Sequence, residues 1–214
     1  MTDHNRDIAT RTRLLTATAV LLAAPLAEAH HAMGGATPTN FVQGFMSGIA
    51  HPVIGLDHFA FLMVAALLSF TLQGKARYLV PLAFVGATLG GTLFHVGAAD
   101  LPFTEVMVAL SALLGGMAVL LKRSAPALLL GGLFAVIGVF HGYAYGESIV
   151  GAEQTPLLSY LAGFALIQYA LIAGGVKLME GLAARSERLQ TIAARTGGAF
   201  ATTAGGLFLA MNLA

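Results

Sequence analysis

Long apolar runs separated by short polar segments dominate the chain from residue 55 onward. We expect helices over residues 55–72, 78–98, 103–121, 126–146, 156–179 and 191–213. Each run is close to the roughly 20 residues with which a helix crosses the ~30 Å hydrocarbon core of a bilayer. The runs lack the strict alternation of polar and apolar residues that is typical of barrel strands. The pattern therefore predicts an all-α, polytopic membrane helix bundle with about six transmembrane helices.

The composition also indicates that the bilayer is the main solvent of the chain. Hydrophobic residues make up 57% of the sequence and charged residues only 10%, whereas a soluble domain carries about 25% charged residues. Cysteine is absent, which excludes disulfides and thiolate metal ligands. No basic cluster or aromatic-interleaved basic face favours a nucleic-acid partner. The lipid bilayer is thus the expected surrounding, and the sequence permits a homo-oligomer without indicating one.

The N-terminal residues have the organisation of a cleavable secretory signal peptide. Three arginines precede an apolar core at residues 14–26, and small residues at 27 and 29 suit cleavage after Ala29. The alternative, an uncleaved first transmembrane helix, requires a span from a core that is short for this purpose and contains Pro25. We therefore expect the signal peptide to be residues 1–29.

The segment between the signal peptide and the first span is too short to cross a bilayer. Residues 40–50 are expected to form a short interfacial or re-entrant helix that ends at His51-Pro52. The predicted division of the mature chain is therefore a periplasmic N-terminal segment at 30–54 and a six-helix transmembrane domain at 55–214.

The basic residues of the mature chain fall on one side of the predicted bundle. They lie in or beside the connections after the first, third and fifth spans, and they are Lys75, Arg77, Lys122, Arg123, Lys177, Arg185, Arg188 and Arg195. The opposite connections carry no basic residue and hold the carboxylates Asp100, Glu105, Glu147 and Glu153. The positive-inside rule makes the basic side the cytoplasm. The mature N-terminus and the C-terminus are then both expected outside.

Glycines recur at a spacing that suits contacts between membrane helices. Small residues four positions apart allow two helix backbones to approach closely. Gly86 with Gly90 and Gly142 with Gly146 have this spacing. Both pairs are therefore expected at contacts between helices.

Ionisable side chains converge at the outer ends of the predicted helices. This level holds His51, Asp57, His58, His95, His141 and Glu147. Such groups are costly near hydrocarbon and are functional candidates there, and imidazole and carboxylate together suit a divalent transition metal. A lone histidine on an apolar face is more often structural, but a convergence of several favours a metal or cation site. Asp57 could be a ligand, or could orient a histidine ligand.

Three further features could contribute to metal handling. Cleavage after Ala29 would expose His30 as a free amine next to His31, a pair that could chelate a metal. Met63 lies below His58 as either a soft contact or a packing residue. Gln168 could line a path through the bundle or hydrogen-bond between helices.

Two stretches, HPVIGLDHFAFLM at residues 51–63 and FHGYAYGE at 140–147, resemble the motifs of the HupE/UreJ family of bacterial nickel and cobalt permeases. The signal peptide followed by about six spans is similar to that family over nearly the whole mature chain. The resemblance implies uptake of Ni²⁺ or Co²⁺ across the bacterial inner membrane. It also implies that the metal-binding residues are His51, Asp57, His58, His141 and Glu147.

The second stretch departs from the family pattern at one position. Tyr145 stands where the family typically has a second histidine, which removes a pair of histidines four positions apart. We hypothesise that His95, from the neighbouring span, replaces it.

The sequence favours secondary transport over an ATP-driven pump. No phosphate-binding loop is present, and a divalent ion moving inward gains about 4.6 kcal/mol per 100 mV of membrane potential. No prosthetic cofactor is expected. The alternatives are an intramembrane metal-dependent hydrolase assisted by Ser111 or Asp57, and a protein that senses or delivers metal. Copper and zinc stay open as alternative metals, since the same ligands suit them.

Capture of the metal by histidine predicts a pH-dependent uptake. Only the neutral imidazole binds a metal, and histidine has an ordinary pKa of about 6.5. We expect metal uptake into vesicles to weaken as the outer pH falls from about 7.5 to about 5.5. A flat profile over this range would contradict capture by histidine.

Overall fold

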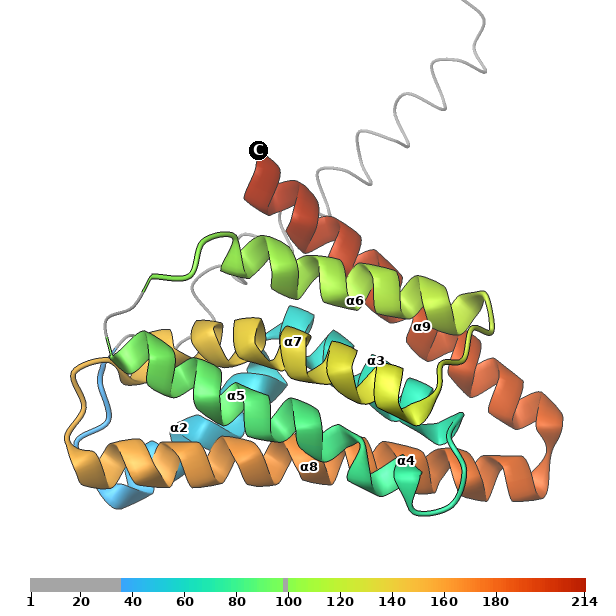
Figure 1. The fold of residues 1–214 in the computed structure, drawn as a ribbon, viewed down its shortest axis with the longest axis horizontal. Coiled ribbons are helices and arrows are strands. Elements are labelled where there is room, and N and C mark those ends of the chain that lie inside the picture. Colours follow the sequence, from blue (N-terminus) through green and yellow to red (C-terminus); the bar gives the residue numbers. More distant parts are fainter. Residues whose placement is uncertain (1–35, 98–99) are drawn as a thin grey trace, which may run out of the picture.

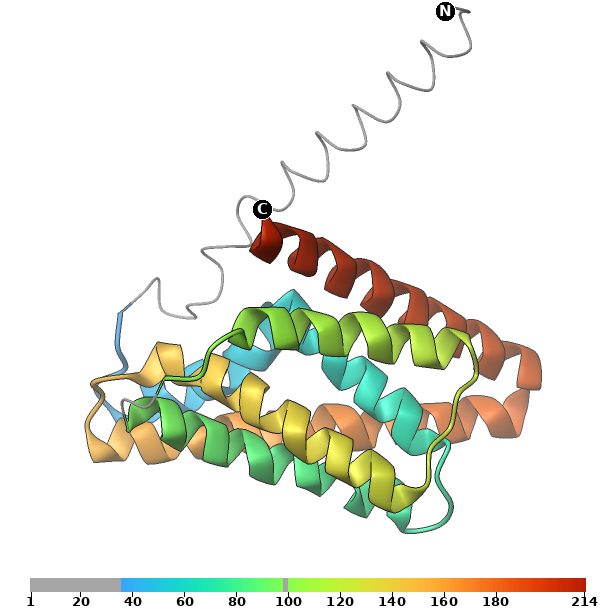
Figure 2. The ribbon, with the colours of Figure 1, turned by 45° about the horizontal axis from the view of Figure 1, so that its top comes forward.

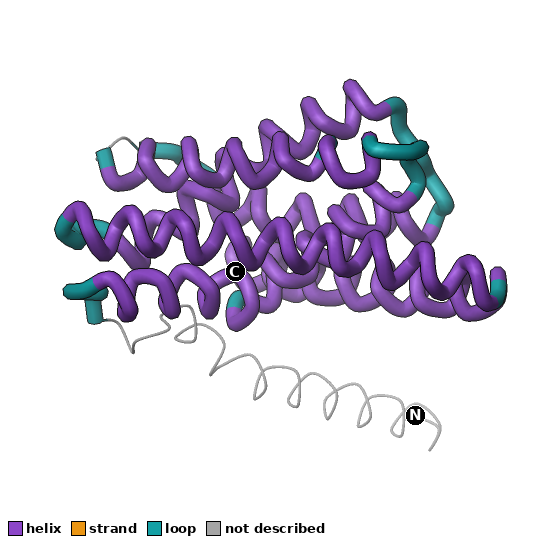
Figure 3. The backbone as a smooth tube through the Cα atoms, turned by 90° about the horizontal axis from the view of Figure 1, so that it is seen from below, coloured by secondary structure: helices purple, strands orange, loops and turns teal. Residues whose placement is uncertain are grey.

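The structure, a computed structural model, describes residues 36–97 and 100–214. The predicted signal peptide, its cleavage site and the pair His30 and His31 lie outside the described residues. Within the described ranges the chain consists of helices and the loops between them, with no strand (Figure 3). The predicted all-α membrane helix bundle is therefore confirmed.

The described helices follow the predicted order along the chain. They are α2 (Phe41–Ile54), α3 (Leu56–Phe70), α4 (Ala76–Leu79), α5 (Pro81–Val96), α6 (Thr104–Leu120), α7 (Ala127–Gly146), the 3-10 helix η1 (Glu147–Ile149), α8 (Gln154–Arg185) and α9 (Glu187–Leu213). Three stretches are each long and apolar enough to cross a membrane, namely Ala76–Val96, Ala127–Ile149 and Gln154–Arg185. Helices α2 and α3 meet the same criterion together, although they are bent by 77°. Helix α6 is apolar but has 17 residues. The count of six spans stays a prediction.

The first helix extends beyond its predicted end. Asn40 caps α2, since its side chain accepts a hydrogen bond from the backbone N–H of Gln43 at 3.0 Å. The expected end at His51-Pro52 was wrong, because α2 continues to Ile54 with Pro52 inside it. Proline lacks only its own N–H and has a helical φ, so a helix packed along its length can pass through it at the loss of one hydrogen bond. The break falls at Gly55, whose ψ of 101° is extended.

Three pairs of helices lie against each other through glycine: α5 with α7, α6 with α9, and α2 with α8 (Figures 1 and 2). A Cβ atom added to Gly142 would lie 2.6 Å from backbone atoms of α5, and one added to Gly116 would lie 2.6 Å from the backbone of α9. At Gly44 it would lie 2.9 Å from the backbone of α8. In lipid, burial of apolar surface gives no net driving force for helix association. Membrane helices therefore associate through close packing of this kind.

The two glycine pairs named by the sequence have different outcomes. Gly142 and Gly146 both face α5, as predicted, and contact Thr88 and His95 there. The prediction for Gly86 and Gly90 was wrong, because an added Cβ at either position meets nothing within 4 Å. The spacing alone does not reveal which face of α5 meets a neighbour.

Helix α3 lies at the centre of the bundle and contacts α8, α6 and α9 as well as α2. Its apolar side chains are buried on several faces, as is typical of a helix surrounded by others. The outer helices instead expose large apolar side chains, such as Leu128 at 90%, Leu158 at 56% and Leu178 at 62%. Apolar exposure on this scale suits a surface that faces lipid.

The basic connections after α3, α6 and α8 lie together at one end of the bundle (Figure 1). Glu180 of α8 joins three groups there. It contacts Arg77 at 3.0 Å and Lys177 at 3.6 Å, and it accepts a hydrogen bond from the Tyr78 hydroxyl at 2.9 Å. These contacts tie α4 to α8.

The glycine contacts predict a clear difference between two conservative substitutions. We expect Gly142→Ala to lower the free energy of unfolding by about 1–3 kcal/mol, because its methyl group would overlap the backbone of α5. Gly90→Ala is the matched control, since it replaces a helical glycine that meets open space. It should be neutral or stabilising by up to about 1 kcal/mol. Unfolding of both variants in detergent, followed by circular dichroism, tests this, and equal stabilities would contradict it.

Candidate metal site at the bend between α2 and α3

The bend at Gly55 brings the two ends of one sequence motif together. His51 lies in the last turn of α2, and Asp57 and His58 lie in the first turn of α3. All three side chains are buried. A Cβ atom on Gly55 would lie 2.8 Å from Cδ2 of His58 and 3.3 Å from the carbonyl oxygen of His51. A residue without a side chain is therefore needed for the two histidines to approach.

Two histidines from different helices meet below the bend. The Nδ1 atoms of His58 on α3 and His141 on α7 are 2.9 Å apart. His141 is fully buried, and its ring packs against Phe61 and Phe84 at centroid distances of 4.7 and 5.4 Å. Two nitrogens that are each 2.0–2.1 Å from a metal, at a right angle, would be about 2.9 Å apart. In the structure this distance is that of a hydrogen bond between the two rings, and it also matches the spacing of two adjacent ligands of one ion.

A serine on α6 contacts the second ring nitrogen of His141. The Oγ of Ser111 lies 2.6 Å from the carbonyl oxygen of Val108 and 2.9 Å from Nε2 of His141. When Ser111 donates to the carbonyl, its oxygen accepts from Nε2 of His141. Nδ1 of His141 is then a lone pair directed at His58. An anchored partner on the second nitrogen is the usual arrangement for a histidine that binds metal.

His51 is held by hydroxyl groups next to this pair. Its Nδ1 lies 2.8 Å from the Ser148 Oγ and 3.2 Å from the Tyr160 hydroxyl. Tyr160 donates to the carbonyl oxygen of Tyr145 at 2.8 Å, so its oxygen accepts from His51. The ring of His51 is 5.7 Å from that of His58. A third imidazole thus stands beside the pair.

Tyr145 occupies the centre of the cluster. Its ring lies 4.3 Å from that of His58 and 5.1 Å from that of His51. Its hydroxyl is buried without a hydrogen-bond partner among the described residues. A buried polar group without a partner is costly and calls for an explanation. Tyr145 therefore places an additional oxygen beside the histidines of the cluster.

Asp57 lies close to the cluster in a backbone-capping position. It is buried, and its Oδ1 accepts a hydrogen bond from the backbone N–H of His58 at 2.8 Å. A carboxylate at a helix N-terminus is stabilised by the unpaired N–H groups there. Asp57 thus provides a hydrogen-bond acceptor for a backbone N–H that the bend would otherwise leave without one.

His95 and Glu147 lie in a separate cavity. Nδ1 of His95 lies 2.7 Å from the carbonyl oxygen of Tyr143. Because a carbonyl oxygen can only accept, Nδ1 of His95 is the donor. Its ring also lies on that of Tyr143 at 4.1 Å. Glu147 is exposed at the end of α7. Both line a cavity of about 350 Å³ together with Glu105 of α6, a carboxylate that no sequence motif marks as a site residue.

The predicted site residues thus divide into two groups. The bundle gathers His51, His58 and His141 in its interior, with Asp57 beside them, and it places His95 and Glu147 at the cavity. Within residues 36–97 and 100–214, no three His, Asp or Glu side chains are arranged to hold one ion. Met63 lies against Gly197 of α9, as a packing residue does.

Two residues that hold His51 carried no signal in the sequence, because Ser148 and Tyr160 are ordinary polar residues of a helix or its end. Ser111, which the sequence offered only as a helper of a hydrolase, contacts His141. Gln168 is fully buried with no partner for either amide atom among the described residues. An unpartnered buried amide fits a residue that lines a path more readily than one that joins two helices.

An all-α membrane bundle with a buried histidine cluster at a broken helix defines the class of protein. The model of the family described as HupE / UreJ protein matches residues 18–208, and the chain belongs to this family. The chain is 28% identical over 196 residues to Protein HupE of Rhizobium leguminosarum bv. viciae, covering 91% of this chain and 96% of that protein. No solved structure matches the chain. The family is one of nickel and cobalt transporters, which supports a role in metal transport.

We expect the contact between Ser111 and Nε2 of His141 to strengthen metal binding by His141. We expect Ser111→Ala to weaken metal binding about tenfold or more, as loss of such a partner typically does. Ser69→Ala is the matched control, because Ser69 is also buried on a central helix but its Oγ has no hydrogen-bond partner among the described residues. Isothermal titration of the purified proteins with Ni²⁺ and Co²⁺ measures both. Equal losses in the two variants would contradict the role of Ser111.

Proposed function

We propose that this protein takes up a divalent transition-metal ion, Ni²⁺ or Co²⁺, across the bacterial inner membrane by secondary transport. The observation that carries the proposal is the buried contact of 2.9 Å between the Nδ1 atoms of His58 and His141. Two imidazoles in this arrangement, beside a third from His51, provide nitrogen ligands inside a membrane bundle. Membership of the HupE/UreJ family supports the same activity.

The entry to the site is the cavity that holds His95, Glu105 and Glu147. Two carboxylates at its lining attract a cation and raise its local concentration. The hydrogen bond from Nδ1 of His95 to a carbonyl leaves Nε2 as the nitrogen with a lone pair. These groups are suited to bind the hydrated ion before it enters the bundle. Under the predicted topology the cavity faces the periplasm.

The ion then exchanges water for protein ligands at the bend. Broken helices at the depth of the membrane are the usual place for substrate sites in secondary transporters. Nδ1 of His141 provides a lone pair that Ser111 keeps in position. Within residues 36–97 and 100–214 the hydroxyl of Tyr145 and the amide of Gln168 are buried without a hydrogen-bond partner. They provide oxygen atoms for the ion or its water on the way inward. The membrane potential supplies the driving force.

The alternative, an intramembrane metal-dependent hydrolase, would keep its metal bound with one coordination position open for water. Transport instead requires that the ion leave the site and cross the membrane. The two functions therefore differ in whether the metal accumulates behind the membrane or stays on the protein.

The decisive measurement is metal uptake into sealed proteoliposomes that contain the full chain. We expect saturable uptake of Ni²⁺ or Co²⁺ and its reduction by at least about tenfold in His58→Ala, because the variant removes one of the two paired nitrogens. Met63→Leu is the control, since it changes the same helix but packs against α9. It should retain uptake.

Two results would overturn the proposal. Binding at the outer face without accumulation in the lumen would indicate a sensor or an enzyme. Unchanged uptake in His58→Ala would exclude the histidine pair from the route. Parallel measurements with Cu²⁺ and Zn²⁺ test the metal, since the same ligand types suit these ions.

A further inference from the structure

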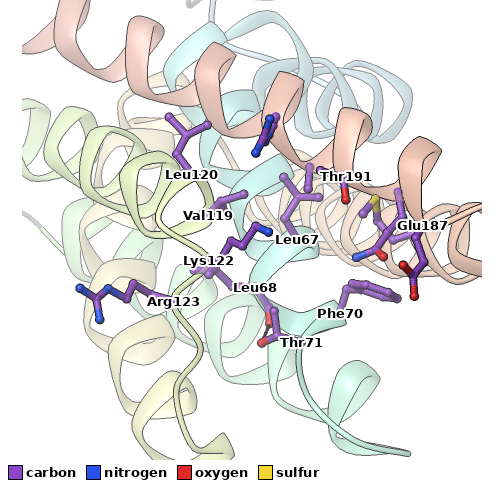
Figure 4. Close-up of a pocket in the computed structure, with 14 residues that line it drawn as sticks. Leu67, Leu68, Phe70, Thr71, Val119, Leu120, Lys122, Arg123, Glu187 and Thr191 are labelled. Atoms are coloured by element: carbon purple, nitrogen blue, oxygen red, sulfur yellow. Dashed lines mark hydrogen bonds between the residues drawn. The ribbon is translucent and has the colours of Figure 1, made fainter.

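We propose that a second cavity, at the basic end of the bundle, binds the headgroup of an anionic phospholipid. The cavity has a volume of about 310 Å³ and lies between the ends of α3 and α6 and the start of α9 (Figure 4). It is separate from the histidine cluster and from the cavity of His95 and Glu147. The inference does not depend on the proposed metal transport.

The charges that line this cavity favour an anion. Lys122, Arg123 and Arg195 contribute three positive groups, against one carboxylate from Glu187. The other basic residues of this end behave differently, since Arg77 and Lys177 are paired with Glu180. Among the described contacts, no salt bridge joins the three cations of the cavity to a carboxylate. An excess of positive charge repels a metal cation, so this cavity is unsuited to its release.

The apolar part of the lining indicates an amphiphile rather than a free anion. Leu67, Leu68, Phe70, Leu120 and Met179 form apolar walls next to the cations. A phosphate group alone gains nothing from such walls, whereas a phospholipid places its headgroup on the cations and its glycerol and acyl region on the apolar side chains. Basic pockets between transmembrane helices at the cytoplasmic surface bind acidic lipid headgroups in this way.

The end of α6 holds Lys122 in an unusual conformation beside the cavity. The N–H of Lys122 donates to the Val119 oxygen at 3.0 Å, and that of Arg123 donates to the Ala118 oxygen at 2.8 Å. These two bonds form a Schellman motif, in which the residue at the position of Lys122 is usually glycine. Lys122 has a φ of 53° there, in the left-handed region that a side chain disfavours. The helix would thus end more easily with glycine at this position.

The conformation of Lys122 directs its side chain into the cavity. Figure 4 shows Lys122 extending toward Leu67, whereas Arg123 extends away along the rim and Glu187 lies on the far side. Lys122 is therefore the cation that a bound phosphate would meet first. Arg195, one helix away on α9, is the second cation of the lining with which the phosphate can pair.

The test compares lipids on the full-length protein purified in a neutral detergent. The probes are phosphatidylglycerol, phosphatidylcholine and inorganic phosphate, with bound lipid counted by native mass spectrometry and stability followed by thermal unfolding. We expect phosphatidylglycerol to bind and to raise the unfolding temperature, and phosphatidylcholine and phosphate to do neither. Equal effects of all three probes would overturn the proposal. An effect of inorganic phosphate as large as that of phosphatidylglycerol would also overturn it.

Variants distinguish loss of the ligand from loss of the fold. Lys122→Gly removes the cation but suits the left-handed backbone, so its unfolding temperature without lipid should be unchanged or higher. Its affinity for phosphatidylglycerol should fall about fivefold, with a similar further loss in the double variant that adds Arg195→Gln. Lys75→Gln is the control, because Lys75 is a cation of the same end outside the cavity. Undiminished affinity in the double variant, or an equal loss in Lys75→Gln, would contradict a specific site.

Discussion

The bend at Gly55 is the constraint on which the rest of the structure depends. In lipid every backbone polar group must be satisfied within the protein, so a broken helix has to be enclosed by its neighbours. In a straight helix His51 and His58 would be separated by about 10 Å along the axis. The bend of 77° instead brings their rings to 5.7 Å. Gly55 permits this approach because the imidazole of His58 occupies the space of a Cβ atom.

The glycine contacts explain how the bend is enclosed. Helix α7 uses one face, with Gly142 and Gly146, to lie directly against α5, and another face to carry His141 and Tyr145 to the cluster. The pair α2 and α8 packs in the same manner, which places Tyr160 beside the last turn of α2. The same close packing thus forms the bundle and positions the donors around the histidines.

The two ends of the molecule have opposite chemistry. One end gathers a histidine and two carboxylates around a cavity, and the other gathers the basic connections. Under the proposed function, the first end attracts a cation and the paired imidazoles act as its ligands further in. At the second end the positive charge instead matches the acidic surface that a cytoplasmic leaflet presents. The same asymmetry thus underlies both the proposed metal route and the proposed lipid site.

The sequence by itself determined the class of protein, the approximate helices and the histidines of the cluster. It could do so because the bilayer demands long apolar runs and places cations on one side, and both are local properties of the chain. Only the tertiary structure decided where α2 ends, which glycines meet a neighbour, and that Ser111 holds His141 across 30 positions of sequence. Helices that are apolar on every face carry no periodic signal of their rotation. Their mutual contacts, and with them the environment of each ionisable group, are therefore fixed by packing alone.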